Sequence, residues 1–417
     1  MRLLLDAVPP QHELEGDRDP AGGLSLPRGR RLRGDDAAPV VVIGAGIAGL
    51  GVSLALARRG LHVSLFERAP VLDEVGAGLQ LSPNALRVLA ELGVITAASA
   101  SAVEARAVTL RAWRSGRTIA RVPVGGSDGT PYLSVHRADL QRSLVAAVVQ
   151  DPRITLTLGT TLRGCRPIAA GHALAFETAG GGQTVEASIV VGADGVHSRL
   201  AASLGLAPPQ DTGLTAWRMT VSAPSGGATG GIEAWLGASA HAVAYPIRAG
   251  QAINVVVLGH REAGTAGEPR AEALAKVEGW DPRLIGMLRG AGEVSRWPLL
   301  TVPPARRWHA APGILLIGDA AHAMPPFAAQ GAALALEDAS VAAQLLAGSA
   351  SAAQAFDRFE SLRRPRVDRV RARVAFHRRI YHLPFPFSLG RDMALRLRSA
   401  ERLGTDLAWL YDWHPPA

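Results

Sequence analysis

The first stretch with a clear secondary-structure pattern is a run of β-branched apolar residues, Val40–Ile43. A glycine-rich turn follows, and then an apolar segment that is typical of a buried helix and stops at Gly60. A second apolar run, Leu61–Phe66, comes directly after that glycine. The order predicts a buried parallel strand, a helix and a second strand within a unit of about 30 residues.

The turn carries Gly44, Gly46 and Gly49 in the spacing G-x-G-x-x-G. The first glycine permits a tight turn, the second lets the backbone approach a pyrophosphate, and the third lets the helix lie close to the strand. Glu67 follows Gly44 by 23 residues (67 − 44), where an acid that binds ribose hydroxyls is expected. This unit predicts a dinucleotide site without separating NAD from FAD. Arg68 leaves NADP open, although Glu-Arg pairs also occur in FAD-binding proteins.

Two later segments repeat the order of strand, turn and helix. In the first, the strand Ile189–Val191 leads into a turn and a helix that opens near Ser198. In the second, the strand Ile314–Ile317 leads into a Gly-Asp turn, and an Ala/Leu-rich helix runs from Gly331 to Leu346.

Two further stretches have the pattern of a sheet, Val108–Val124 and Ala216–Leu258. They predict an antiparallel sheet that forms a second domain over the bound nucleotide, with a pocket for a small planar ligand at the interface. His241 and Tyr245 are four positions apart, which places both side chains on one face of a strand.

Composition narrows the class of protein. The chain has 417 residues, 48% hydrophobic and 19% charged, which suffices for a buried core in about two or three domains. Cys165 is the only cysteine, so we exclude an internal disulfide and a cysteine-based zinc or iron–sulfur site, and predict no metal. No apolar run reaches the roughly 18–20 residues that a membrane helix needs, and no secretory signal is evident. We therefore expect a cytoplasmic protein without stable membrane association.

The net charge of +8 is carried almost entirely by arginine, since Lys276 is the only lysine. Local groups of arginine occur at 28–33 and 363–373, but no continuous basic stripe is present. We expect no nucleic-acid partner; the arginines are interpreted as a solvated surface, with some of them facing anionic ligands.

Three motifs then occur in a recognisable order: GAGIAG at 44–49, GADGVHS at 192–198 and GDAAHAMPP at 318–326. With them the chain resembles the FAD-dependent aromatic hydroxylases, the single-component flavoprotein monooxygenases of the p-hydroxybenzoate and salicylate hydroxylase type. The resemblance implies an α/β fold with a Rossmann-like FAD-binding domain, an inserted, mostly antiparallel β-sheet substrate domain and a C-terminal helical segment.

We divide the chain accordingly. The expected parts are a disordered N-terminal extension at 1–36, a first part of the FAD-binding domain at 37–205 with a sheet insertion near 103–125, a substrate-binding sheet at 206–297, a second part of the FAD-binding domain at 298–360, and C-terminal helices at 361–417. In the last part, a long basic helix is expected to break at Pro384 and Pro386, with one shorter helix after it.

The resemblance also implies cofactor contacts for three charged residues. Asp319 resembles the aspartate that hydrogen-bonds the ribityl chain of FAD. Asp194 resembles the acid that orders the middle motif and is associated with FAD and the pyridine nucleotide. Arg137, at the start of a predicted helix, would approach the FAD phosphate or ribityl oxygens. The alternatives are turn residues that satisfy local N–H groups for the two aspartates, and a surface position for Arg137.

Around the flavin ring the resemblance implies contacts from backbone and proline. The loop and helix at 76–93 would place Gly78 beside the isoalloxazine, and Pro325 and Pro326 would line its reactive edge. Gly318 and Gly331 belong to the same cofactor-binding set. In 3-hydroxybenzoate 6-hydroxylases a glutamine aligns with Pro326, so the proline favours the salicylate-hydroxylase-like branch. His322 is expected to be a packed histidine rather than a catalytic one.

The substrate contacts are expected from the sheet. In the salicylate and 3-hydroxybenzoate hydroxylase branch an H-x-x-x-Y pair lines the pocket, and here His241 and Tyr245 match it. His241 would accept the phenol proton, because the pKa of histidine lies near working pH. Arg218 would bind a substrate carboxylate. The alternatives are a sheet histidine without a catalytic role, and an arginine on the surface or facing the cofactor.

The implied reaction is the hydroxylation of a small phenolic substrate. NADH or NADPH would reduce tightly bound FAD, and O2 would form a C4a-hydroperoxyflavin whose terminal oxygen passes to the ring. The predicted activity is like that of salicylate 1-hydroxylase. The alternatives are 3-hydroxybenzoate 6-hydroxylase and hydroxynicotinate-type activities, with a monomer or homodimer as the assembly.

Two alternative functions are also compatible with the nucleotide-binding motif. Another flavin chemistry on the same fold, such as that of a flavin halogenase, would need an active-site lysine and a W-x-W-x-I-P stretch. Lys276 lies in an ordinary amphipathic segment, and the tryptophan motif is missing. A non-catalytic flavin-binding regulator would keep the glycines without substrate-stimulated oxidation of NAD(P)H.

Overall fold

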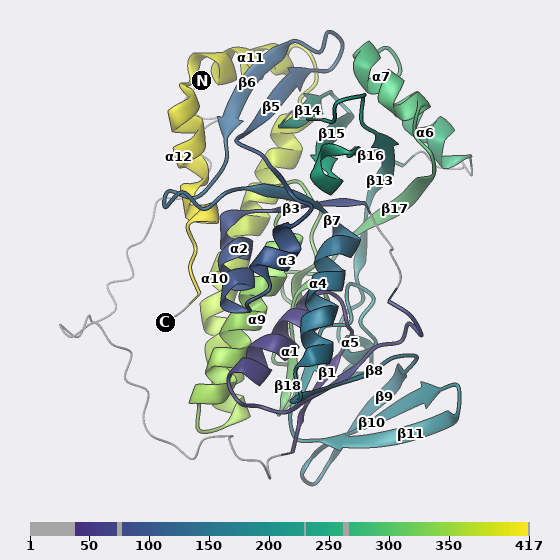
Figure 1. Cartoon of the computed structure of the whole chain (residues 1–417), viewed down its shortest axis with the longest axis vertical. Helices are drawn as coiled ribbons and strands as arrows, with labels where there is room; N and C mark the ends of the chain where they lie inside the picture. The colour runs from purple at the N-terminus through teal and green to yellow at the C-terminus, as the bar shows by residue number, and fades with distance from the viewer. Residues whose placement is uncertain (1–37, 73–76, 229–230, 262–266, 416–417) are drawn as a thin grey trace, which may run out of the picture.

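The computed structural model describes residues 38–72, 77–228, 231–261 and 267–415. The expected N-terminal extension at 1–36 lies outside these residues. The molecule is elongated, with a parallel sheet in one half and a large mixed sheet in the other, and the C-terminal helices run along one side of both (Figure 1).

The parallel sheet confirms the three predicted strand–turn–helix units. Its strands run in the order β18-β12-β1-β2-β8, and every pair is parallel. Their bounds are β1 (Val40–Ile43), β2 (Val63–Phe66), β8 (Ile154–Thr157), β12 (Val190–Gly192) and β18 (Ile314–Leu316). The main helices beside it are α1 (Ile47–Arg58), α4 (Arg137–Gln150) and α9 (Gly331–Gly348).

The strand order decides where the motifs meet. Strands β1, β12 and β18 are neighbours, so the turns after them emerge at one edge of the sheet. The backbone joins them there: Ala193 N donates to Ile43 O at 2.8 Å, and Ile317 N donates to Gly192 O at 2.9 Å. Helices α1 and α9 also pack closely, since a Cβ on Gly51 of α1 would lie 3.2 Å from Leu336 of α9.

The second sheet has seven strands in the order β17-β13-β16-β15-β14-β5-β6. All neighbours are antiparallel except β14 and β5, which are parallel, so the sheet is mostly antiparallel, as predicted. The bounds are β5 (Ala107–Ala112), β6 (Thr118–Pro123), β13 (Gln210–Ser222), β14 (Ile232–Leu236), β15 (Ala240–Ile247), β16 (Ala252–His260) and β17 (Val294–Thr301), with a short 3-10 turn, η2 (Arg248–Gly250), between β15 and β16.

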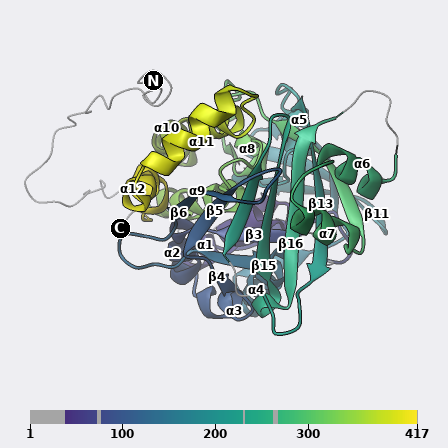
Figure 2. The ribbon, with the colours of Figure 1, turned by 90° about the horizontal axis from the view of Figure 1, so that it is seen from above.

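Two helices cover the outer face of this sheet, α6 (Pro269–Lys276) and α7 (Pro282–Arg289) (Figure 2). Ala242 and Ala244 of β15 pack there, in a cluster with Leu284 of α7. The alternate residues, including Tyr245 and Ile247, pack on the opposite face into the main core. The alternation therefore turns His241 and Tyr245 away from α6 and α7.

Two small sheets complete the strands. β3 (Gly78–Leu81), β7 (Leu133–His136) and β4 (Val103–Glu104) lie between the two large sheets, and β9 (Thr161–Ile168), β10 (Gly171–Thr178) and β11 (Gly181–Ala187) form an antiparallel sheet at the far end (Figure 1). The sequence did not predict the second of these. The shorter helices are α2 (Pro83–Glu91), α3 (Ile95–Ser99), α5 (Arg199–Ser203) and α8 (Asp319–His322).

The C-terminal region has three helices, α10 (Ala352–Tyr381), α11 (Phe387–Leu397) and α12 (Ala400–Tyr411). The long helix ends before Pro384, but two helices follow where we expected one. β17 and α10 each extend across one of the domain boundaries that we expected from the resemblance, at 297 and 360. Pro298 does not end β17 because β17 is an edge strand, and Pro365 lies within α10.

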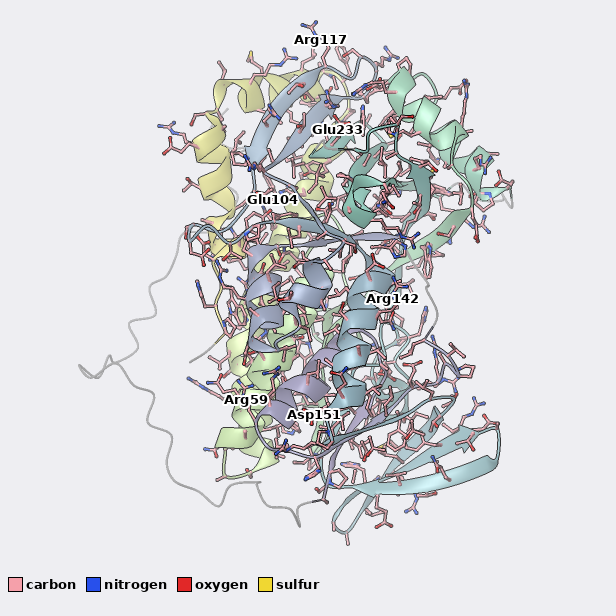
Figure 3. All side chains as sticks on the ribbon, in the orientation of Figure 1. Arg59, Glu104, Arg117, Arg142, Asp151 and Glu233 are labelled. Carbon is pink, nitrogen blue, oxygen red and sulfur yellow. The ribbon has the colours of Figure 1, made fainter. Side chains whose placement is uncertain are left out.

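Charged side chains surround the molecule rather than forming one stripe. Arg59, Arg117 and Arg142 lie in separate parts of the surface, with acidic residues such as Glu104 and Asp151 among them (Figure 3). Within the described residues, no helix is both long and apolar enough to cross a membrane.

Candidate functional site

The glycine-rich turn has the geometry that a nucleotide cradle needs. Gly44 has a φ of +96°, and a Cβ there would lie 2.7 Å from Ala193 O. A Cβ on Gly49 would lie 1.7 Å from Gly44 O, so the helix and the turn touch through backbone. Around Gly46 nothing lies within 4 Å of such a Cβ. The turn is closed on the protein side and open at Gly46, where a phosphate is expected.

Glu67 faces this turn. Its Oε2 accepts a hydrogen bond from Ala45 N at 2.7 Å, and Oε1 accepts one from Ala69 N at 2.9 Å. Each carboxylate oxygen retains a free lone-pair direction, so ribose hydroxyls can still bind. Arg68 is exposed beside it.

Asp194 has a structural contact and an unsatisfied oxygen. Its Oδ2 accepts from Arg199 N at 2.7 Å and Leu200 N at 3.1 Å, at the start of α5, which Ser198 caps. Its Oδ1 is buried without a hydrogen-bond partner. Burial raises the pKa of this carboxyl, and the hydrogen bonds that it accepts oppose that shift. The contacts of Oδ2 are those of a turn residue that satisfies local N–H groups, which was the alternative considered from the sequence. The second oxygen, Oδ1, could accept a hydrogen bond from a ligand.

Charged groups from three parts of the chain converge next to this edge. Arg218 of β13 is largely buried and interacts electrostatically with Arg137 at the start of α4, Asp319 at the start of α8, and Tyr245 of β15. Burial lowers the pKa of Arg218, and its Nε has no hydrogen-bond partner. Asp319 is exposed although it lies beside a buried arginine. Trp217 and Met219, the neighbours of Arg218, pack on the outer face of the sheet, so Arg218 lies on the opposite face, within electrostatic range of Asp319.

Tyr245 lies where β15 meets β3. A Cβ on Gly78 would be 2.6 Å from the Tyr245 ring and 2.7 Å from Asn254, and Gly78 N donates to Asn254 Oδ1 at 2.6 Å. Burial raises the pKa of Tyr245, with Arg218 and Asn254 opposing it. The phenol is therefore protonated at working pH and acts as a donor.

His241 lies at the other end of β15 in a cluster of aromatic rings. Its Nδ1 is 2.9 Å from Nε2 of His382, and its ring centroid is 5.0 Å from that of Phe327 and 5.5 Å from that of Tyr381. Phe327 directly follows Pro325 and Pro326. The predicted base therefore adjoins the segment that was expected at the reactive edge of the flavin.

Burial is the main cause that holds the pKa of His241 well below its ordinary value, and His382 and His377 add to it. Nδ1 of His377 donates a hydrogen bond to Phe327 O at 3.0 Å, so the proton of this imidazole is on Nδ1. Burial likewise lowers the pKa of His377 and of His382 to about 4. All three imidazoles are neutral near pH 7. His377 and His382 were not predicted as site residues, because His377 lies in an arginine-rich helix and His382 directly follows it.

A buried charge network lies behind the Gly-Asp turn. Asp338 of α9 accepts from Gly318 N at 2.9 Å, lies 2.6 Å from His322 Nε2, and is bonded by Arg363 Nε at 2.8 Å. Burial opposes ionisation, but His322 and Arg363 outweigh it and lower the pKa of Asp338 to about 2. His322 is thus a packed, bonded histidine, and Gly318 is anchored through α9 to α10.

Glu337 extends the network in the other direction. Its carboxylate accepts from Arg363, Arg366 and Asn84, each at 2.6 Å. Glu337 and Asp338 are fully buried. We did not predict this network from the sequence, because its two acidic residues are adjacent in a helix rich in alanine and leucine. Gly331, at the start of that helix, has open space around its Cβ position.

Comparison with known proteins now decides the family. A family model described as an FAD binding domain matches residues 37–374. The chain is 35% identical over 381 residues to the 3-amino-4-hydroxybenzoate 2-monooxygenase of Streptomyces cremeus, covering 89% of this chain and 94% of that protein. The chain belongs to the FAD-dependent aromatic hydroxylases. Because this relative is named as a monooxygenase, the chain is a flavin monooxygenase. The family predicted from the three sequence motifs is confirmed.

Further relatives show the range of this family. The hydroxylase is 32% identical to the 3-hydroxybenzoate 6-hydroxylase of Klebsiella oxytoca, over 89% of this chain and 96% of that protein. Among solved structures it is similar to Klebsiella pneumoniae HpxO complexed with FAD and uric acid (TM-score 0.79, 22% identity, 91% and 98% coverage) and to a salicylate hydroxylase substrate complex (TM-score 0.73, 24% identity, 91% and 98% coverage). At these identities the structures support the fold alone.

Proposed function

We propose that this hydroxylase holds FAD along the edge where the three turns meet and hydroxylates a small phenolic acid with NAD(P)H and O2. The proposal is carried by one observation: the candidate base, His241, packs on Phe327 beside Pro325 and Pro326, while Arg218 of the same sheet is within electrostatic range of Tyr245 and Asp319. The sheet thus presents its polar residues to the cofactor-binding edge.

The residues present fit FAD. The open space at Gly46 suits a pyrophosphate, Glu67 suits ribose hydroxyls, and exposed Asp319 suits the ribityl chain. Two buried polar atoms lack a partner that a ligand would supply, Nε of Arg218 and Oδ1 of Asp194. Arg137 would complete the set on the phosphate side, and Gly78, Gly318, Pro325, Pro326 and Gly331 would form the backbone walls.

Bound FAD would supply the activation of O2, and the protein's residues do the rest. His241, when its proton is on Nδ1, donates to His382 Nε2 and leaves its own Nε2 free to accept a phenol proton. As that proton arrives at Nε2, the Nδ1 proton can move to His382, so the charge does not stay on the buried ring. Tyr245 donates a hydrogen bond and stays protonated. The rings of His241 and Phe327 are buried, which keeps water away from the proton acceptor.

The substrate class we propose is a hydroxybenzoate or a close analogue. The relatives named for 3-amino-4-hydroxybenzoate and 3-hydroxybenzoate, and the 33%-identical 6-hydroxynicotinate 3-monooxygenase of Bordetella bronchiseptica, support hydroxylation of a ring that carries both a hydroxyl and a carboxylate. A salicylate 1-hydroxylase activity, favoured by Pro326, is the second candidate; it differs because it would release the carboxyl group as CO2.

The test is a panel of ring acids with the FAD-loaded protein. 3-Amino-4-hydroxybenzoate, 3-hydroxybenzoate, 6-hydroxynicotinate and salicylate would each be tested with NADH and with NADPH, following cofactor consumption and identifying the product. We expect a hydroxylated acid from at least one of the first three. Catechol and CO2 from salicylate alone would establish the second candidate. Cofactor consumption without any hydroxylated product across the panel contradicts both.

A further inference from the structure

A pocket lies next to the candidate site, and most of the residues in its wall were given no role above. It has a volume of about 680 Å³ and opens between α10 and the loops at the ends of β13, β16 and β17. Its wall includes Met324 and Pro325 from the cofactor segment, His382, and Arg371 of α10. It therefore adjoins the reactive segment and the histidine pair from the C-terminal helix side.

Arg371 is the unusual group in this pocket. Its Nε, Nη1 and Nη2 are all buried from solvent, and none has a hydrogen-bond partner among the described residues. A guanidinium carries five N–H donors, and leaving them unpaired out of water is costly. Other arginines of the same helix are paired: Arg363 binds two carboxylates, and Arg364 donates to the carbonyls of Pro304 and Arg306.

The charge around Arg371 does not supply the missing acceptor. Arg378, Arg379, His260 and His382 line the same pocket, and none of its described lining residues is acidic. Burial is the largest influence on the pKa of Arg371 and lowers it. Arg364 lowers this pKa further, and the exposed carboxylate of Asp368 raises it. The pocket thus holds a desolvated cation inside a basic rim.

We propose that this pocket is a binding site for an anionic oxygen group, a carboxylate or a phosphate, held by the guanidinium of Arg371. A planar guanidinium without acceptors is complementary to either group through paired N–H···O bonds. Arg378 and Arg379 at the rim attract the anion toward it. Given the proposed function, the carboxylate would belong to the aromatic acid, and the phosphate to the nicotinamide dinucleotide.

The test is equilibrium binding to the FAD-loaded protein without oxygen, so that no turnover is needed. Benzoate, its uncharged analogue benzamide, and NAD+, which carries the phosphates of NADH but cannot reduce the flavin, would be titrated by calorimetry into the wild type, Arg371→Gln, Arg371→Lys and Arg358→Gln. Arg358 is an exposed arginine of the same helix outside the pocket, which makes it the matched control.

A carboxylate site predicts that Arg371→Gln weakens the binding of benzoate about 10- to 100-fold, changes that of benzamide by less than about twofold, and leaves that of NAD+ unchanged. A phosphate site predicts the same loss for NAD+ and none for benzoate. In either case Arg371→Lys loses less than Arg371→Gln, and Arg358→Gln binds as the wild type does. A wild type that binds neither anion, or Arg371→Gln binding both with wild-type affinity, overturns the site.

A stability measurement separates this role from a structural one. Because the guanidinium is unpaired, Arg371→Gln should raise the Tm of the ligand-free protein by about 1–2 °C. A lowered Tm would mean that Arg371 has a structural partner and would count against the site. The proposed hydroxylation is tested separately on the same samples: retained product formation with unchanged anion binding in Arg371→Gln would overturn the anion site alone.

Discussion

Two regions of this hydroxylase bury charge in opposite ways. Between α9 and α10, Glu337, Asp338 and Arg363 are fully buried, and each is bonded to a partner of opposite charge. On the side that we propose to face the ligands, Nε of Arg218 and the whole guanidinium of Arg371 are buried without an acceptor in the described part of the chain. Folding alone explains the first arrangement, because every charge has a partner. It does not explain the second, in which the ligands that we propose would supply the partner.

The two regions also differ in function: the paired network supports the backbone of the Gly-Asp turn, and His241 is proposed to take part in the reaction. Asp338 holds the backbone of Gly318 from behind, so the paired network fixes the turn from which Asp319 projects. His241 has a neutral partner in His382 and stays uncharged, as a base must be before it accepts a proton. A variant in the network should therefore act on stability, and a variant in the cavity on activity.

The largest expected effect comes from removing the cation of the paired network. Arg363→Ala leaves two buried carboxylates without their main partner and should cost about 3–5 kcal/mol in the free energy of unfolding. Urea unfolding of the FAD-loaded protein measures it, with exposed Arg358→Ala as the control, expected within about 0.5 kcal/mol of the wild type. A loss below about 1 kcal/mol would show that the network is not the anchor described here.

Removing the candidate base should act on turnover instead. His241→Ala should lower the hydroxylation rate about 100-fold or more, since general base catalysis typically contributes at that level. FAD content and the unfolding midpoint should change far less. Product formation is compared with that of His414→Ala, an exposed histidine. Equal rates in the two variants would return His241 to a packing role.

Loss of the ribityl contact should have a smaller effect, on the cofactor itself. Asp319→Ala removes one charged acceptor and should weaken FAD about 10- to 100-fold. Quenching of flavin fluorescence on titration into the apoprotein gives the Kd, and Glu278→Ala, exposed on the far side of the sheet, is the control. Wild-type affinity in Asp319→Ala would remove the assignment.

The smallest expected effect is on the pH profile. His377 and His382 have pKa values of about 4, and burial places that of His241 well below 6.5, so all three are neutral above about pH 5. Protonation would disable the base only below that range. The rate at saturating substrate should therefore fall less than about twofold between pH 7.5 and 5.5. A loss centred near pH 6.5, with FAD still bound, would show that the base has an ordinary histidine pKa.

The parts predicted from the sequence are those encoded locally. The unit from Val40 to Glu67 is specified by contiguous apolar runs and glycines, so its strands, helix and turn were found. The pairing of His241 and Tyr245 on one face followed from the period of a strand. The sheet from β9 to β11 was missed because β11 is largely exposed and has little apolar alternation.

The remaining site residues depend on contacts between distant elements. His382 follows a helix crowded with arginines, and only the packing of α10 against the sheet brings it to His241, 141 residues away. Arg363 and Arg371 look alike in the sequence, yet one is fully paired and the other has no partner among the described residues. The sequence of α10 does not indicate that difference, because the partners of Arg363 lie on another helix, α9.

The most direct test of the central claim is isotope labelling of the product. The FAD-loaded hydroxylase would be supplied with NAD(P)H, 18O2 and the ring acid that gives the fastest turnover, and the product analysed by mass spectrometry. The account predicts one 18O atom in each new hydroxyl group, and loss of that product in His241→Ala with FAD retained. A product without label, or a labelled product formed equally well without His241, would contradict it.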